Sequence, residues 1–207
     1  MRLDKTVILQ ELSRLYPNAE SELDFNSDYE LVSAVLLSAQ CTDKKVNEVT
    51  PVLFKKFPSF SALSRAKLHE VEKIIRPVNY YRTKSKNLIS MASIVTNDFK
   101  EKLPRTHQEL ISLPGVGNKT ANVVLNELGI EPTFPVDTHV FRVSKRLGFA
   151  KGKNVEEVEE ELKKLFKPSE WRELHHWLIL HGRRVCKARN PICKDCAVAK
   201  YCPSCQL

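Results

Sequence analysis

Leu113–Leu125 reads LPGVGNKTANVVL, the most informative stretch of the chain. Its two glycines, Gly115 and Gly117, suit a tight turn that approaches another chain closely, because neither carries a Cβ that would clash. The residues after Gly117 are typical of a helix, and a second helix is expected just before the turn, around residues 107–112. Backbone N–H groups at the start of a helix bind phosphate readily. The stretch therefore predicts a helix–hairpin–helix that can hold a DNA backbone without reading its sequence.

Apolar residues recur at helical spacing along most of the chain. Two helical runs lie between Asp28 and Phe54, and they are separated at residues 40–43, where Thr42 or Asp43 would cap the second. We find no strand alternation and no hairpin signal of the Asn-Gly type. The sequence therefore predicts an all-α protein. Three further apolar faces have the same spacing: Ile8, Leu12 and Leu15; Val155, Val158, Leu162 and Leu165; and Trp171, Leu174 and Leu178.

The charge balance is basic, with 33 Lys and Arg against 25 Asp and Glu, a net charge of +8 and a pI near 9.2. This favours a polyanionic partner, although a membrane surface or an acidic protein would also fit. No apolar run approaches the roughly 20 residues that span a bilayer, and the first residues lack the apolar stretch of a secretion signal. We therefore expect a reducing, cytoplasmic location.

Five of the six cysteines lie between Cys186 and Cys205. In a reducing compartment such crowding favours metal binding over disulfides. One possible set is a Cys-x6-Cys-x2-Cys-x5-Cys loop that could enclose a cubane iron–sulfur cluster: Cys186, Cys193, Cys196 and Cys202. The rival set could hold tetrahedral zinc, but its central spacer is short beside the roughly 15–20 residues typical of paired zinc motifs. That set also leaves Cys186 unexplained: Cys193, Cys196, Cys202 and Cys205. We prefer the first set, with Cys205 outside it.

Three motifs in this order resemble those of the endonuclease III family. They are the hairpin at residues 113–125, the segment VDTHVFR at residues 136–142, and the cysteine loop. The resemblance runs from about Asp28 to Cys202 and so covers most of the chain. It implies a 4Fe–4S cluster on the four cysteines of the first set. It also implies that this chain is a DNA N-glycosylase and abasic-site lyase of base excision repair, with Lys119 and Asp137 as the catalytic pair.

The chemistry of that pair makes physical sense at these positions. Lys119 would lie in the first turn of a helix, where the positive end of the macrodipole disfavours a further positive charge and so favours a neutral, nucleophilic amine. Asp137 precedes an apolar helical run and stands where an N-cap is expected, so N–H donors would keep its carboxylate ionised. An ionised carboxylate can stabilise a sugar cation as the base departs. Taken separately, Lys119 could be a phosphate contact and Asp137 only a cap.

A flipped nucleotide leaves a gap in the base stack, which side chains usually fill. The string Leu37–Asp43 resembles a family loop whose glutamine enters that gap, which implies that Gln40 is the plug. At the second wedge position the family commonly has Gly-Leu-Tyr, whereas this chain has Asn79-Tyr80-Tyr81, so Tyr80 would be the wedge. Asn118 also departs from the arginine common in the family. In the cluster loop, Lys187, Arg189 and Lys194 would meet DNA phosphates.

The resemblance implies two helical lobes with a DNA-binding cleft between them. Residues 22–131 would form a six-helix bundle with the hairpin, and residues 1–21 and 132–207 would form the iron–sulfur lobe. Lys119 and Asp137 would face each other across the cleft. The expected partner is double-stranded DNA with damaged bases or abasic sites, without membrane contact. We expect a monomer associated with a prokaryotic nucleoid.

Three functions remain open at this point. The first is a bifunctional glycosylase and lyase that acts on oxidised pyrimidines. The second is a monofunctional mismatch glycosylase, because the pair Tyr80-Tyr81 resembles adenine glycosylases; these, however, usually have serine where this chain has Lys119, and they carry a further C-terminal domain. The third is a non-catalytic helix–hairpin–helix module, which would leave Asp137 and the cysteine loop unexplained.

Overall fold

The structure is a computed structural model, and it describes residues 4–205 of the 207. Within that range it consists of helices and loops, with no strand, so the all-α prediction is confirmed. None of the described helices is long and apolar enough to cross a membrane. The chain divides into two compact units, Ser21–Ile130 and a second unit that joins Met1–Glu20 to Glu131–Leu207. Naming the first a six-helix bundle and the second an iron–sulfur lobe stays a prediction.

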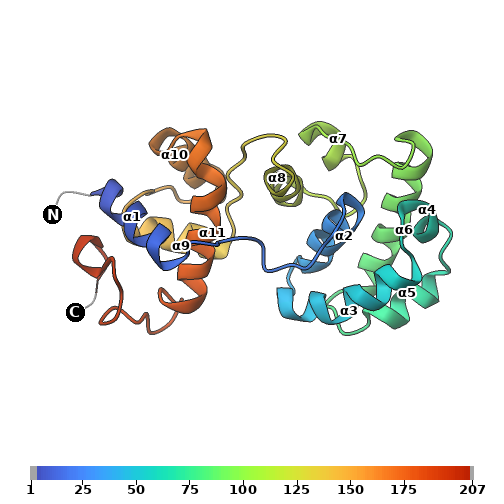
Figure 1. Cartoon of the computed structure of the whole chain (residues 1–207), viewed down its shortest axis with the longest axis horizontal. Coiled ribbons are helices and arrows are strands. Elements are labelled where there is room, and N and C mark those ends of the chain that lie inside the picture. The colour runs from blue at the N-terminus through green and yellow to red at the C-terminus, as the bar shows by residue number, and fades with distance from the viewer. Residues whose placement is uncertain (1–3, 206–207) are drawn as a thin grey trace. The chain divides into compact units, whose positions relative to one another are not determined.

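The unit Ser21–Ile130 is built around α2 (Figure 1). Eight of the nine residues from Tyr29 to Leu37 are buried, which means that neighbours cover this helix on all sides. It packs against α3, α6 and α8. The helices of this unit are α2 (Asp28–Ser38), α3 (Asp43–Lys56), α4 (Phe60–Ser64), α5 (Leu68–Ile75), α6 (Tyr81–Asp98), α7 (His107–Ile111) and α8 (Asn118–Glu127).

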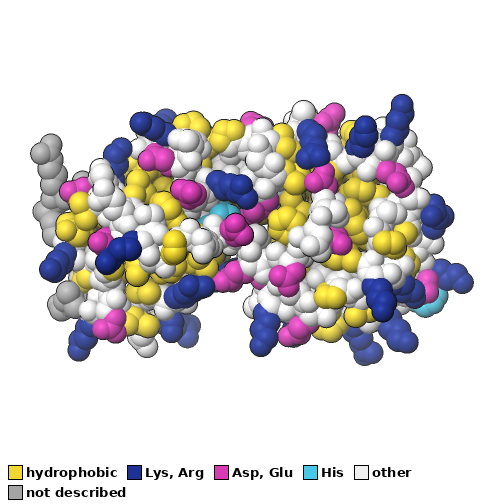
Figure 2. Space-filling view, in the orientation of Figure 1, with side chains coloured by type: hydrophobic (Ala, Val, Ile, Leu, Met, Phe, Trp, Pro, Cys, Tyr) yellow, Lys and Arg dark blue, Asp and Glu magenta, His cyan; other side chains and the backbone are white. Residues whose placement is uncertain are grey.

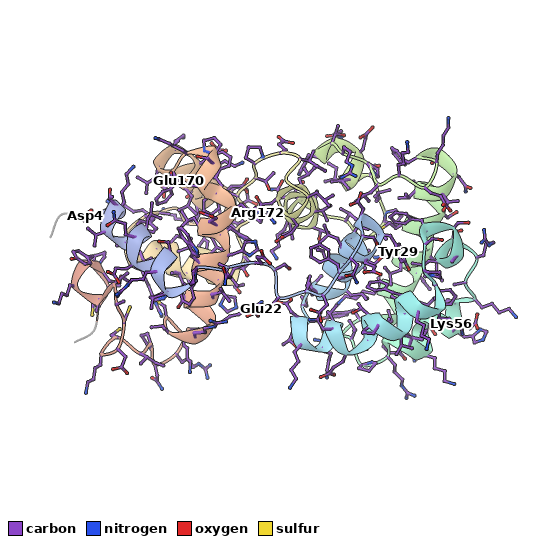
Figure 3. The ribbon with its side chains drawn as sticks, in the orientation of Figure 1. Asp4, Glu22, Tyr29, Lys56, Glu170 and Arg172 are labelled. Atoms are coloured by element: carbon purple, nitrogen blue, oxygen red, sulfur yellow. The ribbon has the colours of Figure 1, made fainter. Side chains whose placement is uncertain are left out.

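Tyr29 shows how the interior of this unit satisfies a buried polar group. Its side chain is buried and points into the bundle in Figure 3. The hydroxyl donates to the Phe57 carbonyl at 2.6 Å, and the ring packs edge-on against Phe54 and Phe60. A buried hydroxyl without such a partner would cost free energy, so this bond fixes α2 against the end of α3.

The second unit contains α1 (Lys5–Leu15), α9 (Thr138–Leu147), α10 (Val155–Leu165), α11 (Pro168–Arg184) and a short 3₁₀ turn, Ala199–Tyr201. Its longest helix, α11, packs against α9 and α1. The apolar faces predicted from the sequence form much of this core, since Ile8, Leu12 and Leu162 are fully buried. Two of the predicted members are exposed instead, because Leu15 is the last residue of α1 and Val155 is the first residue of α10. Helix α1 therefore joins the C-terminal helices although most of the chain lies between them.

The helices begin at the caps that their sequences favour. Thr42 caps α3, because its hydroxyl accepts the Lys45 N–H, and this confirms one of the two predicted caps. Figure 3 marks two others in the second unit, Asp4 at the start of α1 and Glu170 near the start of α11. The Glu170 carboxylate reaches back to the Lys167 N–H at 2.7 Å. These local bonds set where each helix starts and hence which side chains stand at its first turn.

Candidate nucleic-acid interface and catalytic residues

The predicted helix–hairpin–helix is present in the unit Ser21–Ile130. Helices α7 and α8 pack against each other, and the turn between them closes with a hydrogen bond from the Val116 N–H to the Leu113 carbonyl at 3.0 Å. Leu113 and Val116 are buried, so they anchor the turn on the bundle. Gly117 forms the N-cap of α8 and has no side chain to cap it. The first N–H groups of α8 therefore remain available to an external acceptor such as a phosphate oxygen.

The two glycines of the hairpin have different reasons to be glycine. Gly115 has φ +82°, and a Cβ there would lie 2.9 Å from the Asn87 Cβ and 3.0 Å from the Leu36 Cδ1. Its requirement is therefore internal to the bundle. Gly117 has an ordinary φ of −93°, and no atom lies within 4 Å of the Cβ position. Only Gly117 has the open space that the prediction of a close approach by another chain requires.

Lys119 is the second residue of α8 and its side chain is exposed. The predicted place in the first turn of a helix is confirmed. The first turn of α8 contains no acidic residue, and its N–H groups carry the positive end of the helix dipole. The amine is accessible from solvent, while its catalytic role stays a prediction.

Gln40 and Tyr80 stand on two exposed turns of the same unit. Both have left-handed backbone, with φ 53° at Gln40 and 59° at Tyr80, and Tyr80 is 66% exposed. The Asn79 side chain donates to the Gln40 carbonyl at 2.7 Å. The structure therefore brings the two predicted wedge residues together through a contact that spans 39 positions of sequence.

Lys84 is a functional candidate that the sequence interpretation missed. It is almost fully buried on α6, and its ammonium donates to the carbonyls of Leu37 and Ala39 at 2.8 and 2.6 Å. Burial lowers the pKa of Lys84 below its usual value. Lys84 of α6 thus holds two carbonyls of the segment just before Gln40. The only sequence signal was a lysine on the otherwise buried face of α6, which could equally be read as a solvated side chain.

Asp137 is the N-cap of α9, as predicted. Its Oδ1 accepts the backbone N–H groups of His139 at 2.8 Å and Val140 at 2.7 Å. The segment before it is anchored, because Phe134 and Val136 are buried in the core of the second unit. Lys119 belongs to the other unit, so the expectation that these two side chains face each other stays a prediction.

Helix α9 also holds the start of the cysteine loop. Arg142 donates to the carbonyls of Cys186 and Gly182 at 3.1 and 3.0 Å. One turn later, Arg146 donates to the Lys187 and Ala188 carbonyls at 2.7 and 3.1 Å. These two arginines were not among the residues predicted to be functional, although their spacing of four places them on one helix face. The helix that presents Asp137 therefore also positions the loop.

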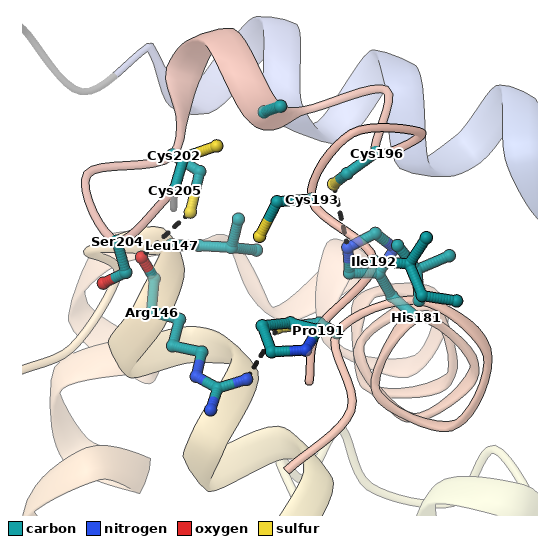
Figure 4. Close-up of a pocket in the computed structure, with 13 residues that line it drawn as sticks. Arg146, Leu147, His181, Pro191, Ile192, Cys193, Cys196, Cys202, Ser204 and Cys205 are labelled. Carbon is teal, nitrogen blue, oxygen red and sulfur yellow. Dashed lines mark hydrogen bonds between the residues drawn. The ribbon is translucent and has the colours of Figure 1, made fainter. Parts of the chain in front are cut away.

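Five cysteines line one cavity in the second unit (Figure 4). Counting the part open to solvent, the cavity holds about 370 Å³. Burial raises the pKa of the Cys196 and Cys202 thiols, and the neighbouring thiols raise both further. The Cys196 Sγ lies 3.6 Å from the His181 Nε2. The lining cysteines are Cys186, Cys193, Cys196, Cys202 and Cys205.

The donor set of this cavity fits an iron–sulfur cluster, because several thiols of one short loop point into the same space. As they stand, however, no three His, Cys, Asp or Glu side chains among residues 4–205 are gathered closely enough to hold a metal ion. Cys205 lines the same space as the four predicted ligands. The position of Cys205 therefore does not distinguish it from the four predicted ligands.

The predicted phosphate contacts of the loop, Lys187, Arg189 and Lys194, are all exposed. Arg189 is followed by Asn190 in left-handed backbone, φ 52°, which marks a sharp change of direction. On the face drawn in Figure 2, basic side chains are interspersed with carboxylates over each unit. The positive charge on that face is therefore spread out rather than gathered in one basic patch.

Comparison with known proteins gives consistent matches. Residues 33–168 match the model of the HhH-GPD superfamily, described as base excision DNA repair proteins. The chain is 44% identical over 196 residues to endonuclease III of Escherichia coli strain K12, an alignment that covers 94% of this chain and 92% of that protein. Both the hairpin and Asp137 lie inside the segment that matches the superfamily.

Two solved structures resemble this one across nearly the whole chain. A non-covalent endonuclease III–DNA complex has a TM-score of 0.91 and 41% identity, covering 96% of this chain and 94% of that one. A trapped covalent endonuclease III–DNA intermediate, described as an estranged-adenine complex, has a TM-score of 0.91 and 40% identity. That alignment covers 99% of this chain and 97% of the other.

Proposed function

This chain belongs to the endonuclease III family of HhH-GPD base excision DNA repair proteins, and on that premise we propose a bifunctional activity with defined catalytic residues. The substrate is duplex DNA with an oxidised pyrimidine. The enzyme releases the base and then cleaves the abasic site by β-elimination. The observation that carries the proposal is the placement of an exposed lysine, Lys119, in the first turn of the helix that follows the DNA-binding hairpin.

Base release requires a nucleophile and a negative charge at the sugar. The neutral amine of Lys119 attacks C1′, and the glycosidic bond breaks with its electron pair leaving on the base. Positive charge develops on the sugar in the transition state, and the Asp137 carboxylate stabilises it. The N–H groups of His139 and Val140 hold the Asp137 carboxylate at the start of α9. In this proposal the two side chains act on the same sugar.

Strand cleavage follows from the same covalent bond. Loss of the ring oxygen bond at C1′ converts the adduct into a protonated Schiff base between Lys119 and the opened sugar. This iminium acidifies the C2′ proton. A base removes that proton, and the electron pair expels the 3′ phosphate, which breaks the strand 3′ to the lesion. Water then releases the lysine. The DNA strand is cleaved without any external cofactor for the elimination.

We propose that duplex DNA is held through its backbone and opened at the lesion. The Gly115–Gly117 turn and the α8 N-terminus take phosphates of one strand. Lys187 and Arg189 take phosphates at the cysteine loop. Gln40 fills the gap left by the flipped base, and Tyr80 wedges between neighbouring bases. Because one lesion needs one active site, a monomer is sufficient. We propose that it acts on DNA at the nucleoid, in the cytoplasm.

We further propose that the cysteine loop holds a 4Fe–4S cluster. The supporting observation is that all the proposed ligands line one cavity of this unit: Cys186, Cys193, Cys196 and Cys202. Four iron–thiolate bonds would fix a loop of otherwise little regular structure. Within the chain itself, Arg142 and Arg146 then connect that loop to α9 and Asp137. The role is structural: it keeps Lys187 and Arg189 in place for phosphate.

The covalent step is tested by borohydride trapping on duplex DNA with a single thymine glycol. We expect a stable protein–DNA adduct with the wild type and none with Lys119→Gln. Lys44→Gln is a matched control, since Lys44 is also exposed and is the second residue of its helix, α3. Trapping at saturating enzyme should leave this control unchanged. Wild-type nicking of abasic DNA by Lys119→Gln would refute the assignment.

The pair Tyr80-Tyr81 at the wedge position is one observation that favours a second function. A monofunctional mismatch glycosylase would release a base from a mispair and leave the strand intact. A panel of thymine glycol, A·G and T·G duplexes, each analysed with and without alkali, separates the two. Alkali-independent cleavage of the thymine glycol duplex supports the bifunctional enzyme. The second function would be supported if bases were released only from a mispair and the strand broke only after alkali. DNA binding without any product would support the non-catalytic module.

A further inference from the structure

Two of the residues with left-handed backbone lie at the proposed wedge. In the described part of the chain, non-glycine residues with positive φ are Gln40, Tyr80, Lys100, Glu101 and Asn190. Side chains other than glycine rarely adopt this conformation, because the Cβ crowds the backbone, so surrounding contacts must hold it. Gln40 and Tyr80 are both exposed, so packing of their own side chains does not supply those contacts.

The contacts come from hydrogen bonds that join the two turns. The Asn79 side-chain amide donates to the Gln40 carbonyl at 2.7 Å. Lys84 makes the second connection: its ammonium donates to the Ala39 carbonyl at 2.6 Å, and its backbone N–H donates to the Tyr80 carbonyl at 3.0 Å. The turn before α6 and the turn after α2 are therefore tied at two places.

The Asn79 bond has a direction that helix capping does not explain. Asn79 lies just before α6, where a side-chain oxygen could cap the helix, yet the N-terminus of α6 has no side-chain cap. Its amide is directed instead to the backbone of a loop from another helix. Asn79 is itself exposed, so it contributes little to the core. What it does contribute is a fixed position of the Gln40 carbonyl relative to Tyr80.

We propose that Asn79 is a positioning residue that couples the Gln40 turn to the Tyr80 turn, so that both side chains enter the duplex as one preformed wedge. The inference rests on the proposed function, because it assumes that these side chains fill the base stack. Its physical basis is that a loop already held in its bound conformation does not lose that freedom on binding. The ligand is the gap and the unpaired base that remain when one nucleotide leaves the duplex.

The test removes the donor and keeps the shape. Asn79→Asp is isosteric but has no N–H to give, and Asn79→Ala removes the group altogether. Stopped-flow fluorescence of 2-aminopurine placed opposite a thymine glycol reports unstacking and wedge entry. We expect both variants to slow this step about fivefold, the factor that corresponds to one hydrogen bond of about 1 kcal/mol. Asn97→Asp, an exposed amide near the other end of α6, is the matched control.

Two further readouts separate positioning from a general defect. Lyase activity on a single-stranded abasic site needs no wedge, so it should stay at the wild-type rate in all three variants. In a double-mutant cycle, adding Asn79→Ala to Gln40→Ala should slow unstacking by less than it does in the wild type, because the side chain that it positions is gone. An unchanged unstacking rate in Asn79→Asp, an equal loss on the single strand, or strict additivity would each overturn the inference. A wild type that cleaves neither substrate would instead refute the proposed function.

Discussion

The Asp137 carboxylate accepts the Val140 N–H at 2.7 Å, and the same oxygen, Oδ1, accepts the His139 N–H at 2.8 Å. Capping α9 therefore uses one side of the carboxylate. A residue that only capped the helix could be replaced by another capping residue without loss of activity. A residue that stabilises a sugar cation could not, because its charge is essential. The two roles of Asp137 can thus be separated by substitution.

Asp137→Asn should keep the helix and lose the reaction. The amide oxygen still accepts the two N–H groups, so we expect an unfolding free energy within about 0.5 kcal/mol of the wild type. Without the negative charge, base excision should fall by about 100-fold or more. Asp137→Ala should lose activity and also about 1 kcal/mol of stability. Single-turnover excision and urea unfolding check these values. Full activity in Asp137→Asn would reduce this residue to a cap.

The hairpin glycines should respond oppositely to alanine. Gly115→Ala places a Cβ in left-handed backbone and against Asn87, so it should cost at least about 1–2 kcal/mol of stability. Gly117→Ala has ordinary backbone and open space, and the poorer cap should cost less than about 1 kcal/mol. We expect Gly117→Ala to weaken DNA binding in the folded protein. Thermal melts and fluorescence anisotropy with duplex DNA measure the two effects. Unchanged DNA affinity would remove Gly117 from the interface.

Substitutions in the cysteine loop should distinguish the cluster ligands from a cysteine that is not a ligand. Cys193→Ser is expected to lose bound iron and sulfide, together with an absorbance band at about 400 nm. Cys205→Ser is expected to retain them, because Cys205 is outside the proposed ligand set. Iron and sulfide analysis of the purified variants provides the readout. Zinc in place of iron, lost on Cys205→Ser and kept on Cys186→Ser, would favour the other set of four cysteines.

Glu161 should make part of the stability of the second unit depend on pH. Its carboxylate accepts the Lys151 N–H at 2.5 Å and the Gly152 N–H at 3.1 Å, and these bonds lower its pKa. A lowered folded-state pKa means that the contribution is complete above the ordinary value of 4.5 and is lost as the pH falls through the folded-state value. Glu161→Gln should therefore melt at a lower temperature than the wild type at pH 7. The gap should narrow as the pH falls from 4.5 and close below the folded-state pKa, and a gap that persisted in stronger acid would contradict this.

Local sequence was sufficient to predict the elements that depend on neighbours along the chain. The helix–hairpin–helix, the N-cap at Asp137 and the first-turn position of Lys119 each rest on steric and hydrogen-bonding rules that act over a few residues. Gly115 shows the limit of such rules. The prediction that this position needs glycine was correct. The reason is that a Cβ there would meet Asn87 and Leu36, which are far away in the sequence.

The sequence by itself therefore determined the all-helical class, the hairpin and the residue types able to do the chemistry, because periodicity and capping are local properties. Only the tertiary structure decided which distant groups support them. The burial of Lys84 under the Gln40 turn, the Asn79 bond to that turn and the arginines of α9 on the cysteine loop all join segments that are distant in the chain. Such contacts depend on how the helices pack, and packing is a property of the whole unit rather than of any one stretch.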